Sequence, residues 1–220
     1  TPPCVLVMAG GTGGHVYPGL AVASELRERG CRVEWLGTKA GLESRVVPSA
    51  GIDLHCITVV GLRGRGIAGW LLAVPRLARA LFQSLSVLRR SRPDAVLGMG
   101  GFASGPGGVA AWLTRKPLLV HEQNAIPGLT NRVLVNLARR VYEAFPNTFP
   151  ARTVAVTAGN PVRADIFDVT PRPDVQGRSL CVLVLGGSQG ASALNSYLPR
   201  ALAALPQSVA VDVRHQCGER

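Results

Sequence analysis

Four glycines and one histidine stand within residues 10–15, directly after the apolar residues 5–9. The stretch 10–19 reads GGTGGHVYPG and follows VLVMA. Glycine lets the backbone adopt positive φ angles and lets a ligand touch bare main chain. The imidazole of His15 titrates near neutral pH. The stretch therefore indicates room for a large anionic ligand at the point where a buried strand ends.

Two further glycine loops have the same setting. Residues 98–108 read GMGGFASGPGG and residues 186–190 read GGSQG, each after an apolar run. The N-terminus of a following helix offers unpaired N–H groups and a partial positive charge, which suit phosphate. Open α/β sheets bind ligands at the carboxyl ends of their strands. The three loops therefore predict a site for phosphate groups.

Several other kinds of phosphate or metal site fit the sequence poorly. Residues 98–103 match G-x-G-x-x-A, and Glu34, 23 residues after Gly11, could bind a ribose in a dinucleotide-dependent oxidoreductase. However, Val16 stands where the third glycine of the first loop belongs, and residues 98–103 lack a following acid-bearing strand. The P-loop pattern and a D-x-D pair are missing, and HEQNA at 121–125 lacks the second histidine of HExxH. The oxidoreductase remains the weaker alternative.

The positive charge is concentrated in one segment. The net charge is +11, and seven arginines but no acidic residue fall between Asp53 and Asp94. At helical spacing, basic and polar residues there fall on one face of a helix and leucines on the other. Such a pattern is typical of a helix lying on an anionic membrane surface. An ordinary surface helix stays open as an alternative. Nucleic acid is disfavoured because no recognition helix or aromatic–basic platform accompanies the arginines. The candidate membrane-binding residues are Ile67, Trp70, Leu71, Arg76, Arg79 and Phe82.

The cysteines and the hydropathy pattern indicate a cytosolic protein. The five cysteines are scattered without a CxxC pair, so we expect reduced thiols and neither a disulfide framework nor a metal site. No apolar run reaches the roughly 20 residues of a membrane-spanning helix. We also expect no secretory signal peptide.

Apolar runs alternate with helical stretches along most of the chain, which predicts an α/β fold with a doubly wound, Rossmann-like parallel sheet. The expected strands are residues 4–9, 32–37, 54–60, 95–100, 117–123, 140–145 and 153–159. The expected helices are residues 18–29, 42–50, 107–114 and 130–139, with the basic segment before residue 92.

A second domain begins after a change in composition. Residues 159–179 are rich in proline and charge and lack periodicity, which indicates a linker. CVLVLGGSQG at 181–190 then repeats the pattern of CVLVMAGGTG at 4–13, with a second strand expected at 208–214. We therefore expect a first domain at 1–160, a linker at 161–179 and the start of a second domain at 180–220. About 40 residues are too few for a complete doubly wound domain, so the second is expected to be incomplete.

Two similar domains that present glycine loops, without a metal motif, favour a metal-independent sugar-nucleotide glycosyltransferase. In such an enzyme helix termini and arginine, in place of a cation, neutralise the departing diphosphate. Five segments then carry a specific resemblance: 10–23, 98–108, 121–132, 159–163 and 185–191 resemble the successive signatures of the MurG family, the bacterial N-acetylglucosaminyltransferases of peptidoglycan synthesis.

The resemblance implies a two-domain GT-B-type fold and an activity. N-acetylglucosamine would pass from UDP-GlcNAc to the 4-hydroxyl group of undecaprenyl-diphosphate-linked N-acetylmuramyl pentapeptide (lipid I), giving lipid II with inversion at the anomeric carbon. It implies no cofactor and no metal. Residues of the matching motifs would contact the sugar nucleotide: Thr12, Gly13, Gly14, Asn124, Arg163 and Ser188. Residues of the second loop would face the acceptor's diphosphate: Gly100, Gly101, Ser104 and Gly105.

Several of these roles have alternatives. An inverting transfer needs a base, and His15 is the candidate, with Glu122 as a weaker rival; His15 could instead orient the loop or bind phosphate. Asn124 would hold a sugar hydroxyl or acetamide, or cap its loop. Arg163 could offer two hydrogen bonds to an oxyanion, or form a surface ion pair.

A lipid-linked acceptor cannot leave the bilayer, so the enzyme has to bind the membrane, and the basic segment could provide that binding. The resemblance thus implies peripheral association with the cytoplasmic face of the bacterial inner membrane. Because the second domain is expected to be incomplete, we predict no turnover by these 220 residues alone. A non-catalytic module that binds lipid-linked diphosphates at the membrane surface is the alternative.

Overall fold

The computed structural model describes the chain except residues 1, 60–72, 171–179, 188–189, 207 and 219–220. The chain divides into two compact units, Thr1–Asp168 and Val169–Arg220. Over the described residues, no helix is both long and apolar enough to cross a membrane.

The first unit is built on a seven-stranded sheet in the order β3-β2-β1-β4-β5-β6-β7, and each adjacent pair of strands is parallel. Continuous apolar runs form its central strands because both faces of a parallel sheet are covered. This confirms the predicted doubly wound α/β fold. The strands are β1 (Cys4–Ala9), β2 (Arg32–Gly37), β3 (Asp53–Cys56), β4 (Ala95–Gly100), β5 (Leu118–Glu122), β6 (Arg140–Glu143) and β7 (Ala155–Thr157).

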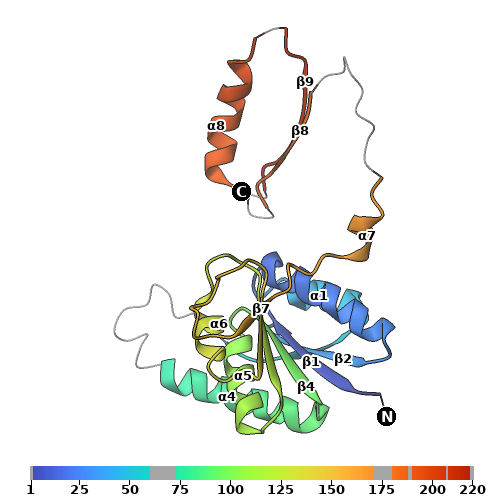
Figure 1. Ribbon diagram of the computed structural model, residues 1–220, viewed down its shortest axis with the longest axis vertical. Coiled ribbons are helices and arrows are strands. Elements are labelled where there is room, and N and C mark those ends of the chain that lie inside the picture. Colours follow the sequence, from blue (N-terminus) through green and yellow to red (C-terminus); the bar gives the residue numbers. More distant parts are fainter. Residues whose placement is uncertain (1, 60–72, 171–179, 188–189, 207, 219–220) are drawn as a thin grey trace. The chain divides into compact units, whose positions relative to one another are not determined.

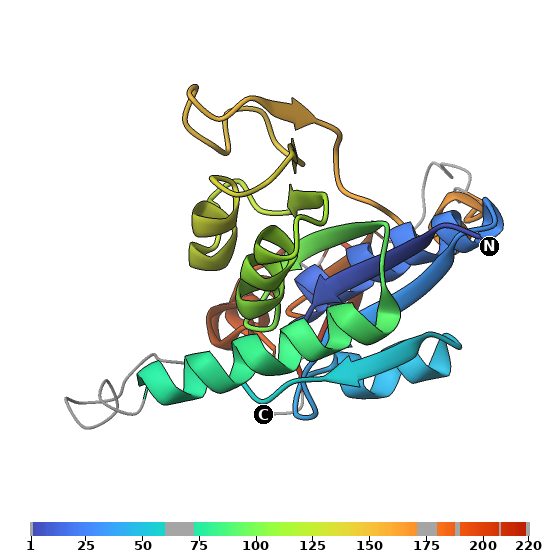
Figure 2. The same ribbon diagram turned by 90° about the horizontal axis from the view of Figure 1, so that it is seen from below.

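Helices cover the two faces of this sheet in two layers (Figures 1 and 2). On one face α4 (Ala73–Ser91), α5 (Ser104–Leu113) and α6 (Leu129–Leu134) pack on the strands through one core cluster. On the other face α1 (Gly13–Glu28) and α2 (Glu43–Ser49) pack through a second cluster around Trp35. A short helix, α7 (Ala164–Phe167), lies near the end of the unit. The two layers fix the strand ends from which the glycine loops emerge.

The helix starts differ from prediction because the first turns of these helices are rich in glycine. α1 begins at Gly13 in place of Pro18, and α5 begins at Ser104 in place of Gly107. Pro18 therefore lies inside α1, where its missing N–H leaves the Gly14 carbonyl without the usual helical donor. Glycine's weak helix propensity hid these first turns from sequence reasoning. The glycine stretches are thus helix N-termini as well as loops.

The remaining boundary errors lie at element ends. α6 ends at Leu134 in place of Arg139, and residues 135–137 continue as turns. β3 ends at Cys56, short of the predicted residue 60, which lies outside the described residues. These corrections leave the strand order and the position of the loops unchanged.

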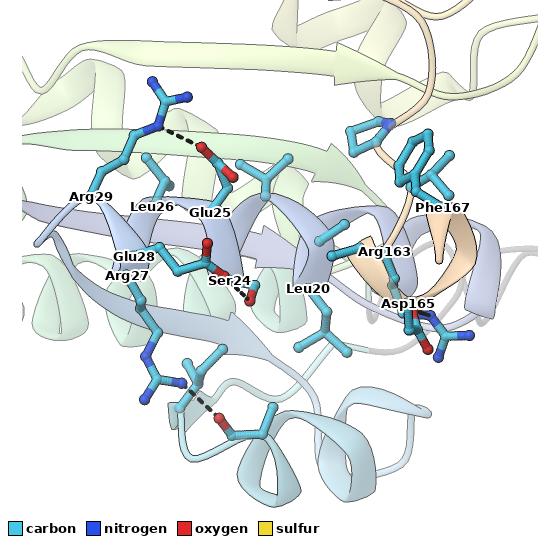
Figure 3. A pocket seen from close by; sticks show the side chains of 17 residues that line it. Leu20, Ser24, Glu25, Leu26, Arg27, Glu28, Arg29, Arg163, Asp165 and Phe167 are labelled. Carbon is cyan, nitrogen blue, oxygen red and sulfur yellow. Dashed lines mark hydrogen bonds and ion pairs between the residues drawn. The ribbon is translucent and has the colours of Figure 1, made fainter. Parts of the chain in front are cut away.

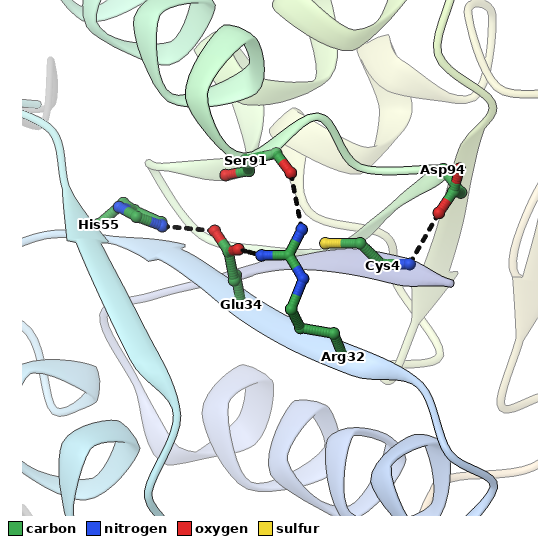
Figure 4. Close-up of polar contacts among 6 residues, drawn as sticks. All are labelled: Cys4, Arg32, Glu34, His55, Ser91 and Asp94. Atoms are coloured by element: carbon green, nitrogen blue, oxygen red, sulfur yellow. Dashed lines mark hydrogen bonds and ion pairs between the residues drawn. The ribbon is translucent and has the colours of Figure 1, made fainter. Parts of the chain in front are cut away.

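A polar cluster ties β2 and β3 to the end of α4 (Figure 4). Glu34 is buried and accepts hydrogen bonds from Arg32 and from His55, whose Nε2 lies 2.7 Å from Glu34 Oε2. Arg32 also donates to the carbonyl of Ser91 at 2.9 Å. Glu34 is thus an internal residue of β2 held in a structural network.

The described residues of the second unit form two parallel strands and one helix. β8 (Leu180–Leu185) pairs with β9 (Val211–Gln216), and α8 (Ser192–Ala203) connects them. β9 begins three residues after the predicted residue 208. The strand–loop–helix at the start of this unit has the same order of elements as β1 and α1.

Candidate functional site

The first two glycine loops touch through their backbones. β1 and β4 are neighbours in the sheet, so the loops that follow them emerge side by side. Gly101 has φ +85°, and a Cβ atom there would overlap the carbonyl oxygen of Gly10. Only glycine fits such a position without distortion. The two loops therefore form one continuous main-chain surface at the carboxyl edge of the sheet.

A buried carboxylate holds the first loop. Glu43, at the start of α2, is fully buried, and its Oε2 accepts the N–H of Gly11 at 2.9 Å. Its Oε1 accepts the backbone N–H of Thr38 at 2.9 Å and the Thr38 hydroxyl at 2.7 Å. Sequence reasoning missed Glu43 because an acid in the first turn of a helix is common. Its role depends on the contact with a loop far away in the sequence.

His15 is held between the two loops. Its Nδ1 lies 3.2 Å from Thr12 Oγ1, and its ring fills the space beside Gly100, where a Cβ atom would stand 2.7 Å from Nε2. Burial lowers the pKa of His15 below its usual 6.5, and the charge of Glu122 opposes that shift. The imidazole is therefore neutral near pH 7. When Nδ1–H donates to Thr12 Oγ1, Nε2 keeps a lone pair that can accept a proton.

Glu122 organises the neighbouring loop. The residue is fully buried, and each carboxylate oxygen accepts two N–H groups. Oε1 accepts from the backbone and side-chain amides of Asn124 at 3.0 and 2.8 Å, and Oε2 accepts from Gly128 N at 3.0 Å and Asn131 Nδ2 at 2.9 Å. With four donors around it, this carboxylate acts as a scaffold for residues 122–131. That arrangement disfavours Glu122 as the base.

The residues predicted to bind the sugar nucleotide gather partly at the start of α1. Thr12 and Gly14 are exposed there, and Gly13 lies against the ring of Tyr17. Asn124 is exposed at the end of β5, with its side-chain nitrogen bonded to Glu122. Ser188 lies outside the described residues. The structure thus brings Thr12, Gly13, Gly14 and His15 together.

The residues predicted to face the acceptor's diphosphate differ in what they expose. Gly101 is half-buried and contacts the backbone of Gly10 in the first loop, whereas Gly100 is buried beside the ring of His15. Ser104 is fully buried, and its Oγ lies 2.8 Å from the Met8 carbonyl and 2.7 Å from the Gly100 carbonyl. Ser104 and Gly105 can therefore contact an anion only through their main-chain N–H groups, at the N-terminus of α5.

Arg163 stands beside the start of α1. Its guanidinium lies 5.5 Å from the centre of the Tyr17 ring, a cation–π contact, and its Nε lies 3.5 Å from Asp165 Oδ1. Figure 3 shows Arg163 and Asp165 at a groove of about 980 Å³ between α1 and the segment around α7. Tyr17, which sequence reasoning missed, thus links Arg163 to the loop that holds His15.

Comparison with known proteins identifies the family. Residues 5–143 match the glycosyltransferase family 28 N-terminal domain, and residues 181–220 match the glycosyltransferase family 28 C-terminal domain. The chain belongs to glycosyltransferase family 28. This confirms the predicted resemblance and the class of fold.

Two curated relatives carry the name UDP-N-acetylglucosamine–N-acetylmuramyl-(pentapeptide) pyrophosphoryl-undecaprenol N-acetylglucosamine transferase. The relative from Alkalilimnicola ehrlichii is 60% identical, with 98% of this chain and 61% of the relative covered. The relative from Chromohalobacter salexigens is 57% identical, with 97% and 60% covered. This family 28 chain thus spans about 61% of the length of the first of them.

Solved structures agree with the family. The crystal structure of Acinetobacter baumannii MurG is 41% identical, with a TM-score of 0.77, and the match covers 100% of this chain and 60% of that one. A glycotransferase of kitacinnamycin, at 18% identity, has a TM-score of 0.69, with 99% and 66% covered. The second likeness shows the fold alone.

The basic segment of this family 28 chain presents apolar side chains to solvent. Val74, Leu77 and Phe82 on α4 are 73%, 56% and 72% exposed. Arg79 is exposed beside them, and Arg76 is half-buried. The predicted Ile67, Trp70 and Leu71 lie outside the described residues. Trp112 and Leu113, exposed at the end of the adjoining α5, were missed because they read as ordinary helix residues.

The described part of this family 28 chain contains no group of three or more histidine, cysteine or acidic residues arranged to hold a metal ion. The described polar groups at the first two glycine loops include main-chain amides, the imidazole of His15 and the hydroxyl of Thr12, and the guanidinium of Arg163 lies beside the start of α1. Such a set can bind diphosphate through hydrogen bonds and positive charge, and can move one proton.

Proposed function

We propose that this chain forms part of an inverting transferase that converts lipid I to lipid II. N-acetylglucosamine would move from UDP-GlcNAc to the 4-hydroxyl group of undecaprenyl-diphosphate-linked N-acetylmuramyl pentapeptide. The names of the relatives support the substrates. The observation that carries the chemistry is the position of His15, half-buried between two bare glycine loops with its pKa lowered by burial.

In the proposed reaction His15 acts as the general base. Nε2 takes the proton of the acceptor hydroxyl while that oxygen bonds to the anomeric carbon of the donor sugar. The bond from this carbon to the diphosphate of UDP breaks with its electron pair, and the configuration inverts to β. The contact with Thr12 supports this role because, when Nδ1–H donates to the Thr12 hydroxyl, Nε2 carries no proton. A positioned base contributes about 10²–10⁴-fold to such a rate.

Main-chain amides and one arginine are proposed to hold the two diphosphates. The start of α1, at Gly13 and Gly14, and Arg163 would receive the diphosphate of the donor, since helix N-termini and guanidinium groups favour phosphate. Gly100, Gly101 and the start of α5 at Ser104–Gly105 would face the diphosphate of the acceptor. Arg163 would have to exchange its exposed partner Asp165 for the ligand.

Asn124 and Ser188 complete the proposed donor site. The amide nitrogen of Asn124 is held by Glu122, which would leave its oxygen for a sugar hydroxyl or acetamide. We further propose that residues 161–179 act as the interdomain linker and that residues 180–220 begin the UDP-sugar-binding domain. The match of residues 181–220 to the family's C-terminal domain supports that assignment.

The test places this chain in a full-length context. The matching segment of the Alkalilimnicola ehrlichii relative is replaced by this chain, and transfer of labelled N-acetylglucosamine to lipid I is measured. We expect lipid II to form, and His15→Ala to lower kcat about 10²-fold or more while the Kd for UDP-GlcNAc changes little. His55→Gln, on β3, is the matched histidine control and should keep kcat.

Two outcomes would contradict the proposal. A folded chimera that binds UDP-GlcNAc but forms no lipid II would remove the transferase assignment. A His15→Ala chimera with nearly full kcat would remove the base assignment and leave the transferase intact. If His15→Ala weakened UDP-GlcNAc binding and left kcat unchanged, His15 would be a ligand-orienting residue.

We also propose that the protein binds the cytoplasmic face of the inner membrane peripherally, through α4. The exposed apolar residues Val74, Leu77 and Phe82 and the exposed Arg79 support this, since apolar insertion and attraction to anionic lipid act together. Co-sedimentation with vesicles tests it: Phe82→Ser should weaken binding to phosphatidylglycerol vesicles. Equal binding to phosphatidylcholine and phosphatidylglycerol would contradict the role of the arginines.

A further inference from the structure

A basic pocket lies at the edge of the sheet opposite the glycine loops. Arg139 and Arg140 stand where β6 begins, and Arg152 precedes β7, so all three are at the amino ends of parallel strands. Together with Thr153 they line a pocket of about 340 Å³. No acidic residue is among the residues that line it. The pocket therefore concentrates positive charge in a concave site.

The usual reason for cations near helix ends does not account for these arginines. Basic residues stabilise a helix dipole only within the last turn. α6 ends at Leu134, five residues before Arg139, and its last turn already carries Arg132. Arg152 lies between β6 and β7, where the structure has no helix. The helix dipole therefore does not explain why the three arginines lie together.

The three arginines lack a side-chain partner within the described part of the chain, whereas Asn136, which also lines the pocket, donates to the carbonyls of Arg132 and Val133. All three arginines are exposed, and none of their side chains forms an ion pair or donates a hydrogen bond to another described residue. The hydroxyl of Thr153 likewise has no described partner. By contrast Arg32 has both a carboxylate and a carbonyl acceptor. Three neighbouring guanidinium groups without a counter-charge repel one another.

We propose that this pocket binds a phosphate group, as a second anion site separate from the glycine loops. Guanidinium groups match the oxygens of phosphate in bidentate geometry, and a hydroxyl adds one more donor. Three positive charges favour a dianion over a singly charged carboxylate. Ligand pockets begin at about 300 Å³, so the volume suits a single phosphate group or a small phosphate ester. The phosphate could belong to a soluble ester or to a lipid headgroup.

The test follows the arginine side chains directly. Inorganic phosphate is titrated into this chain, and the Nε–Hε signals of its arginines are recorded by NMR, against sodium chloride of equal ionic strength. We expect saturable shifts at Arg139, Arg140 and Arg152. Arg152→Gln should weaken the apparent affinity about tenfold, since each charged hydrogen bond contributes at about that level. Arg45→Gln, an exposed arginine on α2, is the matched control and should leave the affinity unchanged.

The readout separates this site from the proposed transferase site. Phosphate at the glycine loops would shift the amides of Gly11 and Gly13, and those shifts should survive Arg152→Gln. Glycerol phosphate, acetate and phosphatidylglycerol vesicles then distinguish a soluble ester, a carboxylate and a lipid headgroup as the source. Shifts that rise without saturation, equal those in sodium chloride, or persist in Arg152→Gln and Arg140→Gln would overturn the proposal.

Discussion

The start of the first unit and the start of the second share a sequence pattern but differ in burial. In β1 five of six residues are buried, whereas in β8 none is. β1 has parallel neighbours on both sides, β2 and β4, while β8 pairs with β9 among the described strands. The shared pattern therefore encodes a local strand–loop–helix, and burial comes from the elements packed around it.

The first and third glycine loops each hold a glycine at positive φ, but different side chains accept its N–H. Gly11 and Gly187 both have positive φ, +90° and +77°. The N–H of Gly11 is accepted by the buried Glu43 at 2.9 Å, and the N–H of Gly187 by the amide oxygen of Gln216 at 3.2 Å. A buried carboxylate holds its loop more tightly than an exposed amide, because hydrogen bonds to charged groups are stronger. The first loop should therefore be the more rigid and the more sensitive to substitution.

The largest expected effect comes from the contact between the first two loops. Gly101→Ala should lower the free energy of unfolding of the first unit by about 3 kcal/mol, because it adds a Cβ atom against the Gly10 carbonyl at positive φ. Denaturant titration measures this. Gly128→Ala, where no atom lies within 4 Å of the added Cβ, is the control. Gly190→Ala, in the second unit, should leave the denaturation midpoint of the first unit unchanged. A shift of that midpoint would contradict the expectation that the first and third loops contribute to stability independently.

A smaller effect is expected when the buried carboxylate becomes an amide. Glu43→Gln puts an NH₂ group against N–H or O–H donors of Gly11 and Thr38, so about 2 kcal/mol of unfolding free energy should be lost. The matched change in the second unit, Gln216→Ala, should cost less than about 1 kcal/mol of that unit's stability. Equal losses in the two units would remove the distinction between the loops.

Burial around the first unit should also appear as a pH dependence. Burial lowers the pKa of both His15 and His121, so the folded chain binds fewer protons than the unfolded chain below pH 6.5. Stability from this source is complete above pH 6.5 and should fall by about 1 kcal/mol as the pH drops to 5.5. Denaturation midpoints across this range measure it. His121→Gln should flatten the profile, and an unchanged slope would assign the dependence to other groups.

The smallest expected effect lies at the margin of the site. Asp165→Asn breaks an ion pair with Arg163 in which both side chains are more than half exposed, so the unfolding free energy should change by less than about 0.5 kcal/mol. Thermal unfolding at low and high salt would measure it. If the loss of unfolding free energy were as large as that of Glu43→Gln, exposed ion pairs would stabilise the first unit as much as the buried contacts do.

Local pattern was enough to predict much of the fold. Residues 4–9, 32–37 and 95–100 were predicted as strands with the observed bounds. The first and third are continuous apolar runs, which are typical of buried parallel strands. The prediction of the helix starts failed because residues that disfavour helices form the first turns, glycine in α1 and glycine and proline in α5. Tertiary packing explains glycines that helix propensity cannot. Gly19, inside α1, leaves room for the ring of Trp35, which would collide with any side chain there.

Local sequence patterns were likewise enough to predict some residues of the candidate site but not others. His15 and the glycines that flank it could be found from spacing, since they lie in two short stretches. Glu43 and Tyr17 could not, because their parts depend on contacts that form only after folding. Glu122 was found as a candidate base, but its four donors come from residues 124–131, and only their geometry indicates a scaffold.

The reach of Glu43 has a practical consequence for protein engineering. Its carboxylate bonds to Gly11, 32 positions earlier, and to Thr38, so the first loop takes its shape from a neighbouring connection. Residues 10–14 transplanted alone into another parallel sheet would lose that acceptor and collapse toward a different turn. A graft that keeps the shape of the first loop has to carry residues 37–43 with it.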